Sequence, residues 1–178
     1  MAPCAGPRSA RDFAEQVLDA TGYDGTQRPL CAGGGPVVVH VQLRLLQMNG
    51  IDQKSGFVKA SGYFRTWWAD PRLAYDGSCS DELFLTGADA MRLWMPDIFV
   101  RNIFALGSAK TLASFVRVRP DGSIFRSEQV TITVKNPLDL GRIPYDSHEV
   151  KIVVASWSQD ITRMRIVPRG GVLGPGTS

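Results

Sequence analysis

The stretch that decides the fold runs from Phe57 to Trp68 and reads FVKASGYFRTWW. Its residues alternate in character, which is typical of a strand with one buried and one outward face. One face carries Val58, Ala60, Phe64, Thr66 and Trp68, and the other carries Lys59, Ser61, Tyr63, Arg65 and Trp67. The segment is therefore predicted to be a half-buried strand whose arginine lies outside the core.

Similar patterns lie on both sides of this strand. The alternation from Val37 to Leu45 predicts a strand before it, and further strands are predicted over residues 112–119, 123–135, 148–157 and 161–167. Turns are expected at Asn49-Gly50 and at residues 120–122, Pro-Asp-Gly. Ser9 followed by Asp12 resembles a helix cap, which predicts a short helix over residues 9–20. These elements favour a mostly antiparallel, all-β protein, either a β-sandwich or a partly open barrel.

Composition narrows the class of protein. The chain has 178 residues, 44% of them hydrophobic and 21% charged, which is typical of one globular domain. A net charge of +3 is too balanced to indicate a nucleic-acid partner. Three widely spaced cysteines (Cys4, Cys31, Cys79) and two histidines (His40, His148) signal neither a disulfide framework nor a metal site, so no metal or cofactor is expected. No apolar run of membrane-spanning length and no intact signal peptide is visible.

Several short motifs occur in a distinctive order. They are WADPRLAY at 68–75, WMPDI at 94–98, Asn102, PDG at 120–122, NPLDL at 136–140, IPYD at 143–146 and Ser156-Trp157. Over residues 9–167 this set resembles the extracellular ligand-binding domain of the pentameric ligand-gated ion channels, the Cys-loop receptor superfamily. The glycine and GABA receptor branch is the most similar. The resemblance implies an antiparallel immunoglobulin-like β-sandwich with a short N-terminal helix.

The resemblance also implies a division of the chain into three segments. The chain differs from the family pattern in two respects: the final strands with loop C, and the loop cysteines. Residues 1–30 would be an N-terminal segment with the helix, 31–168 a β-sandwich ligand-binding domain that stops before the final strands and loop C, and 169–178 a flexible tail. The two cysteines that close the family's name-giving loop match Asn136 and Val150 here. Without that disulfide, the loop is expected to be held by packing and by hydrogen bonds to Asp146.

In the family the ligand binds between two subunits, and one subunit supplies an aromatic cage. Trp157 matches a cage aromatic, and its structural alternative is a core tryptophan at a strand end. Phe99 and Arg101 lie in the loop after the WMPD motif. Arg101 falls where amine-binding members carry an aromatic, which argues against a simple quaternary amine as ligand. Ala155 falls where glycine-receptor-like members carry an acidic residue.

The neighbouring subunit would supply outward faces of strands. Arg65 matches the arginine that holds the agonist's carboxylate in glycine- and GABA-receptor-like members, and a guanidinium fork suits a carboxylate. Ser127 matches a serine that bonds the same carboxylate, Tyr63 matches a family aromatic, and Arg117 and Phe125 share the register of the PDG hairpin. The structural alternatives are an outward arginine on a solvated or subunit-contact face, a half-buried tyrosine and an exposed serine.

The predicted function is therefore that of a ligand-binding domain of a pentameric channel, which binds a small, carboxylate-bearing agonist at subunit interfaces. The partners would be identical or related subunits and a membrane pore domain absent from this chain, with the domain on the extracellular face of the plasma membrane. A soluble, secreted pentameric binding protein without a pore is the alternative. A β-sandwich hydrolase is disfavoured, because Asp70, Asp97, Asp139 and Asp146 lie in turns and loops and form no facing pair on neighbouring strands.

Overall fold

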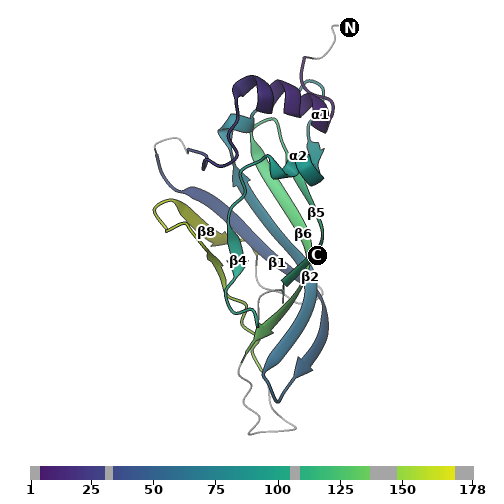
Figure 1. Cartoon of the computed structure of the whole chain (residues 1–178), viewed down its shortest axis with the longest axis vertical. Coiled ribbons are helices and arrows are strands. Elements are labelled where there is room, and N and C mark those ends of the chain that lie inside the picture. Colours follow the sequence, from purple (N-terminus) through teal and green to yellow (C-terminus); the bar gives the residue numbers. More distant parts are fainter. Residues whose placement is uncertain (1–4, 31–33, 105–108, 137–147, 171–178) are drawn as a thin grey trace.

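Two sheets of unequal size make up the β-sandwich in the computed structural model, which describes residues 5–30, 34–104, 109–136 and 148–170 (Figure 1). The larger sheet has the strand order β3-β5-β6-β2-β1-β8, and the smaller pairs β4 with β7. The strands are β1 (Val37–Asp52), β2 (Phe57–Ala69), β3 (Leu83–Leu85), β4 (Ile98–Val100), β5 (Ala109–Val118), β6 (Ser123–Lys135), β7 (Val154–Ser156) and β8 (Met164–Pro168).

The alternation in the second strand is confirmed. β2 lies between β1 and β6 in the larger sheet and pairs with both in antiparallel register. Its predicted core residues are all buried: Val58, Ala60, Phe64, Thr66 and Trp68. A one-residue slip would turn these side chains toward solvent, so the buried face fixes the register of the sheet's centre.

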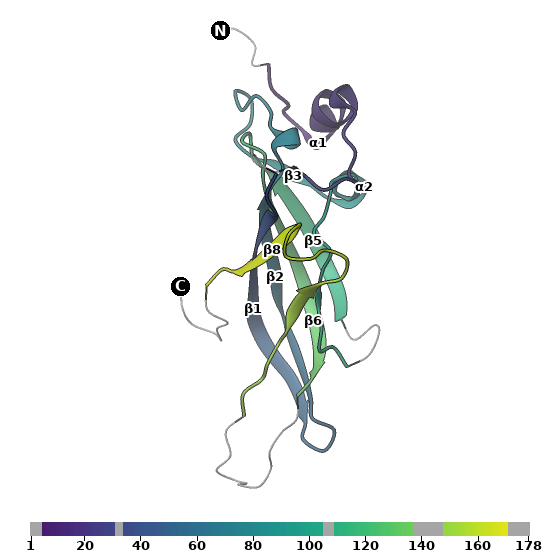
Figure 2. The same ribbon diagram turned by 90° about the vertical axis from the view of Figure 1, so that its left-hand side faces the viewer.

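A helix covers one end of the sheets, close to α2 (Gly87–Met91), as both views show (Figures 1 and 2). It begins as α1 (Ala10–Phe13) and continues as a wider π-helical segment, Ala14–Asp19. The predicted cap is present, since the Asp12 amide donates to Ser9 Oγ at 3.1 Å. Phe13 and Leu18 are buried and anchor the helix to the core.

Asp70 forms the buried polar centre of this end of the molecule, directly before the 3₁₀ turn Pro71–Leu73. Arg72 donates to both of its carboxylate oxygens, with Nε–Oδ1 at 2.8 Å and Nη2–Oδ2 at 2.7 Å. The Tyr23 hydroxyl donates to Oδ2 at 3.0 Å and accepts the Trp94 amide at 2.9 Å. Burial is the main cause that raises the pKa of Tyr23 to about 12. This network joins three segments that are distant in the sequence.

Two local predictions were wrong. The turn expected at Asn49-Gly50 is absent, because β1 continues to Asp52 and Gly50 pairs with Lys59; the turn comes at residues 53–56. The strand expected over residues 148–157 is confined to Val154–Ser156. The prediction of a mostly antiparallel arrangement is confirmed, with the exception that β8, which begins at Met164, runs parallel to β1.

Other predictions concern residues that lie partly or wholly outside the described ranges. These include Tyr145, Asp146 and the rest of the segment 137–147, as well as Cys4, Cys31 and the tail beyond Gly170. Cys79 is described and is disulfide-bonded, so the expectation that the cysteines signal no disulfide was wrong for this residue. Within the described ranges, no helix is long and apolar enough to cross a membrane, and no cluster of side chains is suited to a metal ion.

Candidate functional site

Five of the predicted site residues gather on the outward face of the larger sheet. Tyr63 and Arg65 come from β2, Phe125 and Ser127 from β6, and Arg117 from β5. The strand register brings them together, because Arg65 pairs with Ser127 and Arg117 pairs with Phe125. With Trp67, Phe84 and Phe115 they line a depression of about 540 Å³, here called the β2–β6 depression.

Arg65 is the available cation of this depression. Its guanidinium lies over the Tyr63 ring, 5.4 Å from the centroid. Among the described residues its guanidinium makes one polar contact, a long one of 3.5 Å from Nη1 to Gln42 Oε1, and its buried Nε has no hydrogen-bond partner. No carboxylate of the described residues forms an ion pair with it. A guanidinium in this state can accept a carboxylate without first breaking an internal ion pair.

Ser127 lies opposite Arg65 and is only 6% exposed, so the alternative of a merely exposed serine is wrong. Arg117 differs from Arg65, because its Nη1 already contacts Glu82 Oε2 at 3.0 Å. Its guanidinium also lies 4.5 Å from the Phe125 centroid. Glu82 could not be found from the sequence, since nothing in its own segment predicts that β3 follows it and pairs with β5 beside Arg117.

The remaining three predicted residues lie on the smaller sheet. Phe99 belongs to β4, and Trp157 follows β7 directly. Their rings make an edge-to-face contact with centroids 5.4 Å apart. Trp157 is 83% exposed, so the alternative of a core tryptophan is wrong. Arg101 is exposed, and its backbone amide donates to Val153 O at 2.7 Å. Phe99 is half-buried, so this part of the smaller sheet presents mainly the Trp157 ring to solvent.

Asp97 fixes the position of Trp157. Its carboxylate accepts Ser156 Oγ–H at 2.8 Å and the Ser158 amide at 2.6 Å, and its carbonyl accepts the Trp157 amide at 3.2 Å. Burial acts to raise the pKa of Asp97, but the hydrogen bonds from Ser158 and Ser156 outweigh it, so the pKa is lowered. The exposed Trp157 is therefore held in position by hydrogen bonds between Asp97 and the backbone of its own segment.

Asp97→Ala is expected to loosen the Trp157 segment. Loss of charge-assisted hydrogen bonds, each worth about 1.5–3 kcal/mol, should speed amide hydrogen exchange at Ser158 by about tenfold or more. The matched control is Asp160→Ala, because Asp160 caps the next turn through Thr162 and Arg163. That control should speed exchange at Thr162 and leave Ser158 unchanged. Equal exchange at Ser158 in the wild type and Asp97→Ala would exclude this positioning role.

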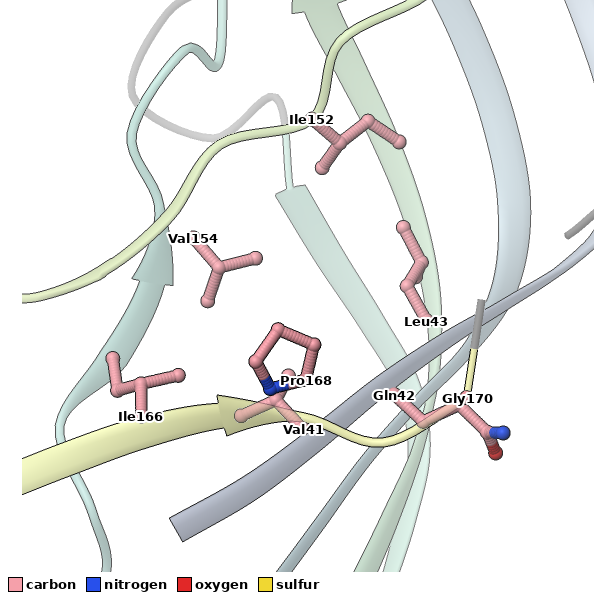
Figure 3. Close-up of a pocket in the computed structure, with 8 residues that line it drawn as sticks. All are labelled: Val41, Gln42, Leu43, Ile152, Val154, Ile166, Pro168 and Gly170. Atoms are coloured by element: carbon pink, nitrogen blue, oxygen red, sulfur yellow. The ribbon is translucent and has the colours of Figure 1, made fainter. Parts of the chain in front are cut away.

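The structure does not unite the two groups of predicted residues. None of Phe99, Arg101 and Trp157 lines the β2–β6 depression. A separate apolar cavity of about 320 Å³ lies between the sheets, where Leu43, Ile152 and Val154 converge (Figure 3). No predicted site residue lines it. The chain thus carries the predicted residues in two separate groups on different sheets: those of the cationic, aromatic depression, and Phe99 and Trp157 with Arg101 nearby.

Comparisons with known proteins identify the family of the chain. The family model described as "Neurotransmitter-gated ion-channel ligand binding domain" matches residues 11–171. The chain is 29% identical over 147 residues to a glutamate-gated chloride channel of Drosophila melanogaster, which covers 80% of this chain and 32% of the relative. It is 30% identical over 138 residues to a gamma-aminobutyric acid receptor alpha-like protein of the same species, covering 76% and 20%.

A third relative is the neuronal acetylcholine receptor subunit beta-4 of Rattus norvegicus. It is 23% identical over 164 residues, which covers 92% of this chain and 33% of the relative. The chain therefore spans 20 to 33% of the length of these three curated relatives.

Proposed function

Because the chain belongs to the neurotransmitter-gated ion-channel ligand-binding domain family, we propose that it binds a small, carboxylate-bearing ligand between two copies of itself or of a related subunit. The ligand's carboxylate would meet Arg65 and Ser127 of one copy. The aromatic pair Phe99 and Trp157 of the next copy would cover it. Ligand binding would then bias a pore in the membrane between closed and open states.

The observation that carries the proposal is the state of Arg65. It lies in a concave, aromatic-lined depression, beside a buried serine and without an acidic partner among the described residues. A buried guanidinium Nε without a hydrogen bond is costly, and a ligand carboxylate would satisfy this donor and the uncompensated charge of Arg65 together. Two of the relatives are named for glutamate and gamma-aminobutyric acid, and both compounds carry a carboxylate.

Binding between copies would account for the separation of the β2–β6 depression from the Phe99–Trp157 pair, because each would then be a partial site. Head-to-tail contacts around a closed ring would place the β2–β6 depression of each copy against the Trp157 face of its neighbour. Five related subunits, an extracellular position and attachment to a membrane pore domain belong to the same proposal and rest on family membership. The disulfide at Cys79 supports an oxidising compartment, as expected outside the cell.

Arg65→Gln is expected to weaken binding of glutamate, gamma-aminobutyrate or glycine, whichever the wild type binds, by about 10- to 100-fold. This is the worth of a hydrogen-bonded charge pair. Calorimetric titration of the assembled protein measures the change. Lys59→Gln is the matched control, because it removes the same charge from the outward face of the same strand and should leave the affinity unchanged.

Two outcomes would contradict the proposal. One is an unchanged affinity in Arg65→Gln, and the other is equal binding of a carboxylate-free amine such as acetylcholine. Mixing Arg65→Gln copies with Trp157→Ala copies tests the interface itself. Each variant retains the partial site that the other lacks, so some mixed interfaces would be intact and would recover binding. No recovery in mixtures that still assemble would place the site within one copy.

A further inference from the structure

A second, smaller depression adjoins the β2–β6 depression where the chain leaves β8. It has a volume of about 170 Å³, and it shares the Trp67, Arg117 and Phe125 wall. The rest of its lining is Arg119, Ser123, Ile124 and Arg169. Three arginines, Arg117, Arg119 and Arg169, thus line a space that the proposed agonist contacts do not occupy.

The side chains of this wall form a continuous stack. The Arg169 guanidinium lies 4.6 Å from the Trp67 ring centroid, Trp67 lies 5.0 Å from Phe125, and Phe125 lies 4.5 Å from the Arg117 guanidinium. A cation therefore closes each end of a pair of rings. A guanidinium that packs its flat face on a ring keeps its N–H groups at the edge, where they can donate to an anion.

The charges around the space do not balance internally. Glu82 is shared between Arg117, at 3.0 Å, and Arg119, at 2.7 Å. The Asp121 carboxylate accepts the amide and hydroxyl of Ser123, each at 2.8 Å. Arg169 has no acidic partner among the described residues, and the Arg117 Nε is buried without a hydrogen bond.

Arg169 is also held in place. Its backbone amide donates to Val41 O at 2.8 Å, which continues the β1–β8 pairing one residue beyond Pro168. Backbone pairing at the edge of the sheet therefore fixes the position of the Arg169 backbone, from which the guanidinium reaches over Trp67. A volume of 170 Å³ corresponds to roughly five or six water molecules, enough for a carboxylate or sulfate group.

We propose that this space, here called the Arg169 site, binds a small oxyanion such as a carboxylate or sulfate group. Arg169 supplies the uncompensated charge, and Arg117 and Arg119 supply further N–H donors. The ligand is a second anion beside the agonist depression, and the proposal does not depend on the proposed agonist. Occupation of the site would place negative charge next to Arg117, the cation common to both depressions.

The test is an NMR titration of arginine Nε–H resonances with sodium sulfate and, separately, sodium acetate at constant ionic strength. We expect saturable shifts for Arg169 and Arg117, and Arg169→Gln should weaken the binding at least tenfold. Arg165→Gln is the matched control, since it removes an exposed arginine four residues earlier on β8, away from the site, and should bind as the wild type does. Arg169→Lys keeps the charge without the fork and should bind with intermediate affinity.

Arg65→Gln separates this site from the agonist depression. It should leave sulfate binding unchanged even if it abolishes binding of the agonist. Linear shifts without saturation, or equal saturation in the wild type and Arg169→Gln, would overturn the proposal. Loss of sulfate binding in Arg65→Gln but not in Arg169→Gln would move the anion into the β2–β6 depression and would also overturn it, while the proposed function would stand.

Discussion

Arg72→Met is expected to lower the free energy of unfolding by about 3–5 kcal/mol, because it leaves a buried carboxylate without its charge partner. The Asp70 side chain is 0% exposed, and Arg72 donates to both of its oxygens. Methionine keeps most of the aliphatic volume of arginine, so the effect reports the lost contacts of the guanidinium: the ion pair with Asp70 and the hydrogen bond to Gln27 O at 2.9 Å. Urea denaturation gives the change in the free energy of unfolding.

The control is an ion pair of the same kind on the surface. Arg92 pairs with Asp19, and both side chains are largely exposed. Arg92→Met should cost less than about 1 kcal/mol. Asp70→Leu combined with Arg72→Met should recover part of the stability lost in Arg72→Met, because it removes the buried charge as well. If Arg72→Met and Arg92→Met lowered the free energy of unfolding by the same amount, burial would not determine how much the Asp70–Arg72 pair stabilises the protein.

Much of the larger sheet could be predicted from the sequence, because β2 at its centre alternates strictly between buried and outward residues. The parity of Tyr63, Arg65 and Ser127 was enough to place them outside the core, and antiparallel pairing between neighbouring strands brought them together. Trp157 carried less information. It follows a strand of only three residues, and its exposure depends on hydrogen bonds to Asp97, which lies 60 positions earlier.

The remaining differences have nonlocal causes. Asn49-Gly50 has the composition of a tight turn, but pairing with β2 extends past it, and register shifts at Leu45/Gln47 and Met48/Gly50 absorb the irregularity. The parallel β1–β8 pair and the Arg169 site join segments more than 100 residues apart. No local pattern encodes such pairings. The sequence-based division into three segments stays a prediction.

Asn136 explains how a segment without strand pairing is fixed. The residue is only 4% exposed. Its side-chain Oδ1 accepts a hydrogen bond from the Lys151 backbone amide at 2.9 Å, and its backbone amide donates to Gly56 O at 2.8 Å. Asn102 makes two more hydrogen bonds to this segment: its Nδ2 donates to Lys151 O at 2.7 Å, and its Oδ1 accepts from the Val153 amide at 3.0 Å. Two asparagines thus replace the ladder that the predicted strand over residues 148–157 would have made.

Asn136→Leu is therefore expected to lower the free energy of unfolding by about 2 kcal/mol, because it keeps the buried volume and leaves the Lys151 amide without its acceptor. Hydrogen exchange at Lys151 should accelerate more than exchange in β2. The match of Asn136 and Val150 to the two loop cysteines of the family stays a prediction; on that match, the hydrogen bond from Lys151 to Asn136 would take the place of the disulfide.

The matched control is Asn49→Leu. Asn49 is exposed and makes one side-chain hydrogen bond, accepting from Ser61 Oγ at 2.9 Å, so its replacement should change stability by less than about 0.5 kcal/mol. If Asn136→Leu were as stable as the wild type, packing alone would hold residues 148–153 against the sheet. If only Asn102→Ala destabilised the protein, the closure would depend on Asn102. The hydrogen-bond account requires both asparagines to contribute, with the larger loss at the buried one.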